Sequence, residues 1–214
     1  LPKNATLGKV NIIDFQQGNF NLLPGKATKS SGRLAYESLK IASNDLLSKK
    51  IDAIVTAPIN KDIIQNSNFN FMGHTEYFTF RCELDESLML MCYKKLRVGL
   101  VTNHLPISNV SKNISMKLIT KKINTFNTVL ESDFNIKNPK LALLGLNPHS
   151  GDNGLIGNEE KKIIIPTIKE LKSKNINVFG PFPADGFFAN KNYLNYDGIL
   201  AMYHDQGLIP FKVL

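Results

Sequence analysis

The sequence lacks the features that would place a protein in a membrane. No apolar run approaches the ~20 residues that a membrane helix needs, and residues 1–6 lack the apolar core of a signal peptide. Cysteine is also scarce, because Cys82 and Cys92 are the only two and do not form a CxxC pair. We therefore expect a cytoplasmic protein with two reduced, partly buried thiols and no membrane partner.

Long runs of one charge are also missing. The chain has 26 Lys and Arg against 18 Asp and Glu, a net charge of +8. The lysines occur as scattered pairs such as Lys49-Lys50 and Lys121-Lys122, without a long basic run or an arginine stripe with interleaved aromatics. We expect solvated lysine faces and no nucleic-acid partner. A mildly positive body favours a phosphorylated or carboxylated substrate.

The apolar residues that are present predict an α/β fold. Of the 214 residues, 43% are hydrophobic, and a chain of this length can bury roughly 70% of its unfolded surface. Strand-like and helical segments alternate, which predicts a parallel or mixed sheet covered on both faces. Strands are expected at 51–57, at 87–92 and in the three segments that lead into His104, His149 and His204. Helices are expected from Ser30, between His104 and Lys140 with Ile119, Ile123, Phe126 and Leu130 as core face, and from Asn158, interrupted at Pro166.

Three of the four histidines directly follow predicted strands. His104, His149 and His204 come after apolar segments and are flanked by loop-forming Pro and Gly residues. Ligands of open α/β sheets bind beyond the carboxyl ends of the strands, so these imidazoles can converge there. Three neutral imidazoles suit a divalent metal with one open coordination position, as in catalytic zinc sites. The alternative is three unrelated histidines satisfied by backbone hydrogen bonds.

Two aspartates lie near these histidines in the sequence or in a comparable loop. Asp205 directly follows His204, and Asp185 lies in the Pro/Gly-rich segment 180–186. A carboxylate beside a metal can orient a ligand or act as a general base. The alternatives are a turn residue for Asp185 and a helix N-cap for Asp205.

Further residues suit an anionic substrate. His74 and Thr75 follow Gly73 and offer an imidazole, a hydroxyl and backbone N–H groups. Lys212, eight residues beyond His204, can supply a point charge for a phosphate. No P-loop or G-x-G-x-x-G fingerprint is present. The residues by themselves indicate a metal-dependent enzyme that acts on a small anionic substrate.

Taken together, a series of segments closely resembles the 4-hydroxythreonine-4-phosphate dehydrogenase family of vitamin B6 biosynthesis. The matching segments are Thr56-Ala-Pro-Ile-Asn-Lys61, Gly73-His-Thr-Glu-Tyr-Phe78, Thr102-Asn-His-Leu-Pro106, Gly145-Leu-Asn-Pro-His-Ser-Gly151, Gly157-Asn-Glu-Glu160, Gly180-Pro-Phe-Pro-Ala-Asp185 and Ala201-Met-Tyr-His-Asp-Gln-Gly-Leu208. The resemblance implies the two-domain α/β fold of isocitrate and isopropylmalate dehydrogenases. Residues 1–62 would then be part of the first domain and 63–214 the second, in a chain truncated at both ends.

The resemblance also implies roles for these residues. His104, His149 and His204 match the family's metal ligands, one of them donated across a homodimer interface, and the metal would be zinc, with magnesium or cobalt as alternatives. His74, Thr75 and Lys212 match residues that bind the phosphorylated substrate, while Asp185 or Asp205 would handle the proton. The implied reaction is NAD- or NADP-dependent oxidation of the C3 hydroxyl of 4-phosphohydroxythreonine and loss of CO2, giving 3-amino-2-oxopropyl phosphate.

Three other functions stay open on the sequence. The first is a dehydrogenase of the same family that oxidises a sugar-acid phosphate or a cyclic dihydrodiol. The second is a metal-dependent hydrolase, whose three-histidine site would activate water and would need no nicotinamide. The third is a non-catalytic binding protein, which would bind ligand without forming product.

Overall fold

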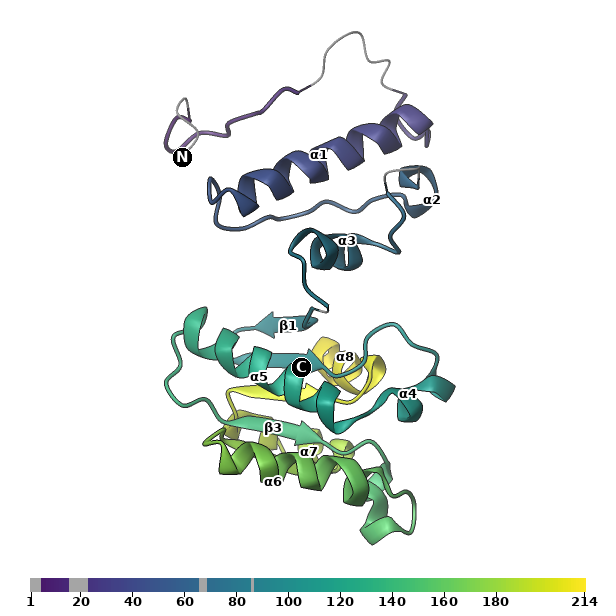
Figure 1. The fold of residues 1–214 in the computed structure, drawn as a ribbon, viewed down its shortest axis with the longest axis vertical. Coiled ribbons are helices and arrows are strands. Elements are labelled where there is room, and N and C mark those ends of the chain that lie inside the picture. The colour runs from purple at the N-terminus through teal and green to yellow at the C-terminus, as the bar shows by residue number, and fades with distance from the viewer. Residues whose placement is uncertain (1–4, 16–22, 66–68, 86) are drawn as a thin grey trace. The chain divides into compact units, whose positions relative to one another are not determined.

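A computed structural model describes residues 5–15, 23–65, 69–85 and 87–214. The chain forms two compact units, Leu1–Ser87 and Leu88–Leu214 (Figure 1). The expected mixed α/β fold is confirmed, with the sheet in the second unit. The assignment of 1–62 and 63–214 to two family domains stays a prediction.

The first unit is helical in the residues described. It contains α1 (Lys29–Leu47), α2 (Lys61–Ile64) and α3 (His74–Arg81). The helix expected from Ser30 is confirmed. It begins at Lys29 after the N-cap Thr28, whose side chain forms a capping box with that of Ser31. A small core holds the helices together, and its buried members are Leu39, Ile64, Phe69 and Tyr77.

The strand expected at 51–57 is wrong. This segment has no strand pairing, and the side chain of Val55 is 99% exposed. An apolar run becomes a strand only when a neighbouring strand takes up its N–H and C=O groups, and the described part of the first unit contains no strand.

The second unit is built on a five-stranded sheet of order β1-β2-β5-β3-β4. The strands are β1 (Leu90–Tyr93), β2 (Leu96–Leu100), β3 (Leu141–Leu144), β4 (Val178–Phe182) and β5 (Gly198–Ala201). β1 pairs with β2 antiparallel at one edge, whereas β2, β5, β3 and β4 are parallel. The strand expected at 87–92 thus begins later, at Leu90, and the sheet is mixed as expected.

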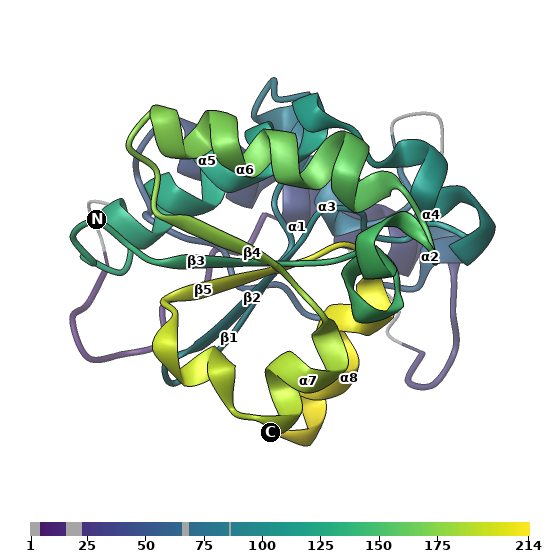
Figure 2. The same cartoon turned by 90° about the horizontal axis from the view of Figure 1, so that it is seen from below.

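Helices cover both faces of this sheet (Figure 2). On one face lie α5 (Met116–Ser132) and α6 (Ile165–Ser173), and on the other lie α7 (Ala184–Ala189) and α8 (His204–Val213). The strands alternate between the two cores: Leu141 and Leu143 pack toward α5, while Ala142 and Leu144 pack with Phe187 and Leu208. The predicted core face of α5 is confirmed, because Ile119, Ile123, Phe126 and Leu130 are fully buried.

Shorter helical segments connect these elements. They are α4 (Ile107–Asn113), η1 (Pro148–Gly154), η2 (Glu160–Ile164) and η3 (Asn192–Asn195). The helical stretch expected from Asn158 is present, with the π-helix η2 leading directly into α6 at Ile165, next to Pro166. The backbone stays helical at Ile164 and Ile165, so the proline, which has no N–H to donate, coincides with a change of helix type and not with the interruption expected there.

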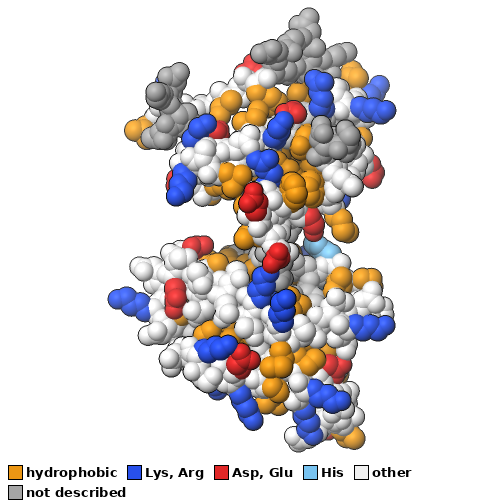
Figure 3. Space-filling view, in the orientation of Figure 1, with side chains coloured by type: hydrophobic (Ala, Val, Ile, Leu, Met, Phe, Trp, Pro, Cys, Tyr) orange, Lys and Arg blue, Asp and Glu red, His pale blue; other side chains and the backbone are white. Residues whose placement is uncertain are grey.

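The surface agrees with the composition. Lys and Arg side chains are interspersed with acidic and apolar ones on the face shown in Figure 3. Among the described residues, no helix is long and apolar enough to span a membrane. Cys82 and Cys92 are both exposed, which corrects the expectation of partly buried thiols.

Candidate active site

The carboxyl ends of four parallel strands meet at one edge of the sheet of the second unit. β5 lies between β2 and β3, so the loop that holds His104 and the start of α8, which holds His204, are neighbours. The Thr102 hydroxyl donates a hydrogen bond of 2.7 Å to the carbonyl of Met202 and joins the two loops just before the histidines. Strand order therefore explains why these residues, far apart in the sequence, come together.

His104 and His204 form a pair. Their ring centroids are 5.5 Å apart and their planes are inclined by 43°. Nδ1 of His204 lies 2.7 Å from Oδ1 of Asp205. With Nδ1–H donating to this carboxylate, Nε2 keeps its lone pair for an electrophile or a metal. Asp205 lies in the first turn of α8 rather than at the N-cap, which is Tyr203.

His149 lies in η1 and is exposed. Within residues 5–15, 23–65, 69–85 and 87–214, no three His, Cys, Asp or Glu side chains are grouped so that they could hold a metal. The structure thus brings two of the three predicted ligands together in one chain. The third ligand, and with it the complete metal site, stays a prediction.

Gln206 braces the site, although sequence reasoning did not single it out. Its side chain accepts a 2.7 Å hydrogen bond from the backbone N–H of Met202 and donates one of 2.6 Å to the carbonyl of Gly145. Gly145 follows β3 and Met202 follows β5, so one amide joins the loops that lead to His149 and His204. Its position two residues after His204 is the sequence feature that could have identified Gln206 as a residue of the site.

Asp185 and Lys212 lie on α7 and in the last turn of α8. Asp185 is exposed in the first turn of α7, which follows β4. Lys212 is exposed in the last turn of α8, so eight residues of helix, about 12 Å of rise, separate its Cα from that of His204. Among the contacts described for this unit, none joins either side chain to His104 or His204.

The first unit holds the other predicted anion ligands. His74 and Thr75 open α3, where the first backbone N–H groups have no partner within the helix. Nε2 of His74 is buried without a hydrogen-bond partner among the described residues. Burial, reinforced by the nearby ammonium of Lys61, lowers the pKa of His74 below that of a free imidazole. Lys61, which ends the segment 56–61, is a cation of this site that sequence reasoning passed over.

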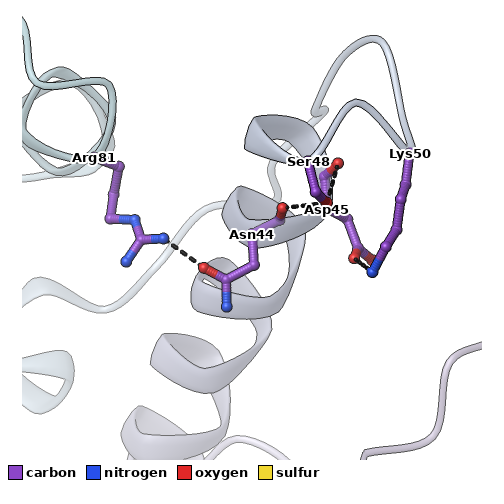
Figure 4. A network of polar contacts seen from close by, with 5 residues as sticks. All are labelled: Asn44, Asp45, Ser48, Lys50 and Arg81. Atoms are coloured by element: carbon purple, nitrogen blue, oxygen red, sulfur yellow. Dashed lines mark hydrogen bonds and ion pairs between the residues drawn. The ribbon is translucent and has the colours of Figure 1, made fainter.

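Helix α3 is fixed to α1 at its other end. The Arg81 guanidinium donates a 2.5 Å hydrogen bond to the side-chain oxygen of Asn44 (Figure 4). Ser48 bonds the Asn44 carbonyl at 2.7 Å, and Lys50 pairs with Asp45 at 3.0 Å, which closes the end of α1. The Arg81–Asn44 hydrogen bond anchors the helix whose first turn carries His74 and Thr75.

A cavity of about 940 Å³ lies at the opposite edge of the sheet of the second unit. Arg97, near the start of β2, and Lys140, just before β3, are among the residues that line it, together with Tyr196. It contains none of the predicted site residues. The chemistry indicated by the sequence therefore lies at the carboxyl edge and not in this cavity.

Comparison with known proteins shows what family this site belongs to. The model of the family described as pyridoxal phosphate biosynthetic protein PdxA matches residues 2–214. The chain belongs to this family. A 4-hydroxythreonine-4-phosphate dehydrogenase of Bacteroides thetaiotaomicron is 43% identical over 98% of the chain.

Solved structures of similar proteins have the same fold over the part that matches this chain. The 4-hydroxythreonine-4-phosphate dehydrogenase of Klebsiella pneumoniae matches 90% of the chain with a TM-score of 0.83 and 32% identity. A terephthalate 1,2-cis-dihydrodiol dehydrogenase of Burkholderia xenovorans LB400 matches 90% with a TM-score of 0.70 and 25% identity. The chain spans 58% of the length of the Bacteroides and Klebsiella proteins and 60% of the Burkholderia one.

Proposed function

We propose that this chain carries the metal- and substrate-binding part of an NAD- or NADP-dependent 4-hydroxythreonine-4-phosphate dehydrogenase. The observation that carries the proposal is the His104–His204 pair, supported by Asp205, at the carboxyl edge of the sheet in a member of the PdxA family. The implied step belongs to pyridoxine 5'-phosphate biosynthesis.

The residues at this edge suit a divalent ion. The ring centroids of the two imidazoles are 5.5 Å apart, and Nδ1 of His204 is hydrogen-bonded to a carboxylate. Zinc and cobalt readily bind imidazole nitrogen, whereas magnesium prefers oxygen ligands. His104 and His204 would hold the ion, and His149 of a second copy of the chain would complete the site in a homodimer. When bound, the metal supplies Lewis acidity toward the substrate oxygen.

The chain's own residues would bind the substrate and move its proton. His74, Thr75 and Lys212 would bind the phosphate, aided by Lys61 beside His74. Oxidation takes a hydride from C3 to the nicotinamide and the hydroxyl proton to Asp185 or Asp205. The β-keto acid then loses CO2, and C2 takes up a proton to give 3-amino-2-oxopropyl phosphate. Asp205 is already committed to orienting His204, which favours Asp185 for the proton.

The remaining features of the proposal concern the whole protein. The chain would form part of a two-domain isocitrate/isopropylmalate-dehydrogenase-like fold and would act in the cytoplasm as a homodimer. The family membership and the mixed α/β sheet support this arrangement.

A second candidate function is oxidation of a cyclic cis-dihydrodiol, favoured by the likeness to the Burkholderia dihydrodiol dehydrogenase. Reduced nicotinamide formation with 4-phosphohydroxythreonine and with a carboxylated cis-dihydrodiol, each with NAD and NADP, separates the two. We expect turnover of the phosphorylated substrate only, because His74 and Lys61 offer an imidazole and an ammonium near the open N–H groups of α3. Turnover of the diol alone would contradict the proposal.

A further inference from the structure

The loop that carries His149 is held by a buried carboxylate. Glu160, the first residue of η2, is only 2% exposed. Its Oε1 accepts the backbone N–H groups of Leu146 and Asn147, both at 2.8 Å, and its Oε2 accepts the Asn147 side-chain amide at 2.9 Å. A buried carboxylate is costly unless it is fully hydrogen-bonded. These donors explain why it is tolerated, and they fix the start of the loop.

The loop itself needs outside support. His149, Ser150, Asp152 and Asn153 all have positive φ, between 40° and 52°. Residues with side chains rarely adopt this conformation, and it persists where surrounding contacts determine it. Gly151 has a φ of 81°, and a Cβ there would lie 2.6 Å from Oε2 of Glu160. The carboxylate therefore packs against the loop two residues after His149.

A second carboxylate links this loop to the helix that follows His104. Glu159 accepts a 2.9 Å hydrogen bond from the Asn147 amide and one of 2.5 Å from the Ser111 hydroxyl of α4. Hydrogen bonds from Ser111 and then Asn147 lower the pKa of Glu159. The Asn147 amide group thus donates to both carboxylates, and α4, Glu159, Asn147 and Glu160 form one continuous set of contacts.

We propose that Glu160 and Glu159 are positioning residues for metal binding, acting through Asn147 on the loop that presents His149. The inference rests on the proposed function, in which His149 is a metal ligand. Neither carboxylate touches the metal in this account. They set the loop from which the imidazole extends.

The polarity of the Asn147 contacts supplies a specific test. In Glu160→Gln, one side-chain N–H₂ faces the Asn147 N–H₂, so two donors meet. If Asn147 turns its amide to avoid this, its oxygen faces the Glu159 carboxylate, and two acceptors meet. In the double variant Glu159→Gln/Glu160→Gln, the turned Asn147 oxygen can accept from both glutamines. Both glutamine oxygens remain to accept from Ser111 and from the backbone.

The measurement is Zn²⁺ binding to the full chain by calorimetry, at a temperature well below the unfolding midpoint of each variant. We expect Glu160→Gln to weaken Zn²⁺ binding about 10–100-fold, as for other groups that orient metal ligands, and Glu159→Gln to weaken it less. The double variant should lose less than the product of the two single losses. Glu170→Gln is the matched control, because the Glu170 side chain is exposed on α6 and its only described contact is with Lys174.

Two results would overturn the inference: wild-type Zn²⁺ affinity in Glu160→Gln, or a double variant whose loss equals or exceeds the product of the singles. A merely structural role would lower the unfolding temperature and leave the affinity of the folded protein unchanged. His149→Ala, measured in parallel, separates this failure from that of the proposed function. If His149→Ala binds Zn²⁺ as tightly as the wild type, His149 is not a ligand and the proposed metal site is wrong. If His149→Ala binds Zn²⁺ more weakly but Glu160→Gln does not, only the positioning role of Glu160 is wrong.

Discussion

At the residue scale, the electrostatics of His74 connect the fold to substrate binding. Burial first, and the Lys61 ammonium second, lower the pKa of this imidazole below its ordinary value of 6.5. A group whose pKa is lower in the folded state destabilises folding when it must take up a proton. Above about pH 6.5 His74 is neutral in both the folded and the unfolded state, and its burial costs no proton. The free energy of unfolding therefore decreases as the pH falls from about 6.5 toward the lower pKa of the folded state.

The neighbouring charges predict how His74 responds to variants and ligands. Lys61→Met should raise the pKa of His74, and bound 4-phosphohydroxythreonine should raise it further, because a phosphate favours the imidazolium. Histidine NMR titration of the full chain measures both changes. Lys40→Met is the control, since Lys40 lies on α1 and pairs with Glu37. A His74 pKa that is insensitive to the phosphorylated substrate would contradict its role in phosphate binding.

Some of the residue contacts at the site can be predicted from the sequence, and others cannot. The pairing of His104 with His204 could be predicted, because both follow strands and parallel strands end at one edge. The structural role of Glu160 could not be predicted from the sequence. Its place after Gly157-Asn158 indicated a helix start with favourable acidic residues, and only the fold shows the side chain bonded to Leu146 and Asn147.

At the scale of elements, α1 and α2 are packed unusually close at Gly32. A Cβ at this position would lie 2.1 Å from the backbone carbonyl oxygen of Ile63. The usual gain from replacing a helical glycine by alanine, about 1 kcal/mol, is therefore outweighed by the clash with a backbone atom that cannot move independently.

Gly32→Ala should destabilise the first unit by roughly 1–3 kcal/mol, the typical cost of overpacking. Hydrogen exchange of the α1 and α2 amides in the full chain measures this locally and should show faster exchange. Ser38→Ala, at an exposed position of α1, should leave exchange nearly unchanged. Equal protection in Gly32→Ala and wild type would show that the two helices can separate without cost.

Elements differ in how well the sequence predicts them. The sequence predicts α5 and its buried face correctly, because four apolar residues at helical spacing indicate an amphipathic helix. The segment 51–57 was not, because an apolar run has no intrinsic partner and here finds no strand to pair with in the described first unit. Local periodicity is sufficient for an amphipathic helix, whereas a strand depends on the rest of the chain.

In the molecule as a whole, the predicted site residues are distributed over both units of the chain. His74, Thr75 and Lys61 lie in Leu1–Ser87, while the histidine pair, Asp185 and Lys212 lie in Leu88–Leu214. In the proposed function, His74, Thr75 and Lys212 bind the phosphate of the substrate, and His104 and His204 hold the metal. The proposed metal site also takes His149 from a second copy of the chain, so we expect activity to depend on dimer formation.

The central claim is that the strand-end histidines serve a metal-dependent dehydrogenase. The most direct test is NADH or NADPH absorbance with the full-length enzyme, 4-phosphohydroxythreonine and the matching nicotinamide, before and after chelation. We expect a signal that vanishes with chelator and returns when a divalent metal is added. A signal that continues undiminished after the metal has been removed would contradict it.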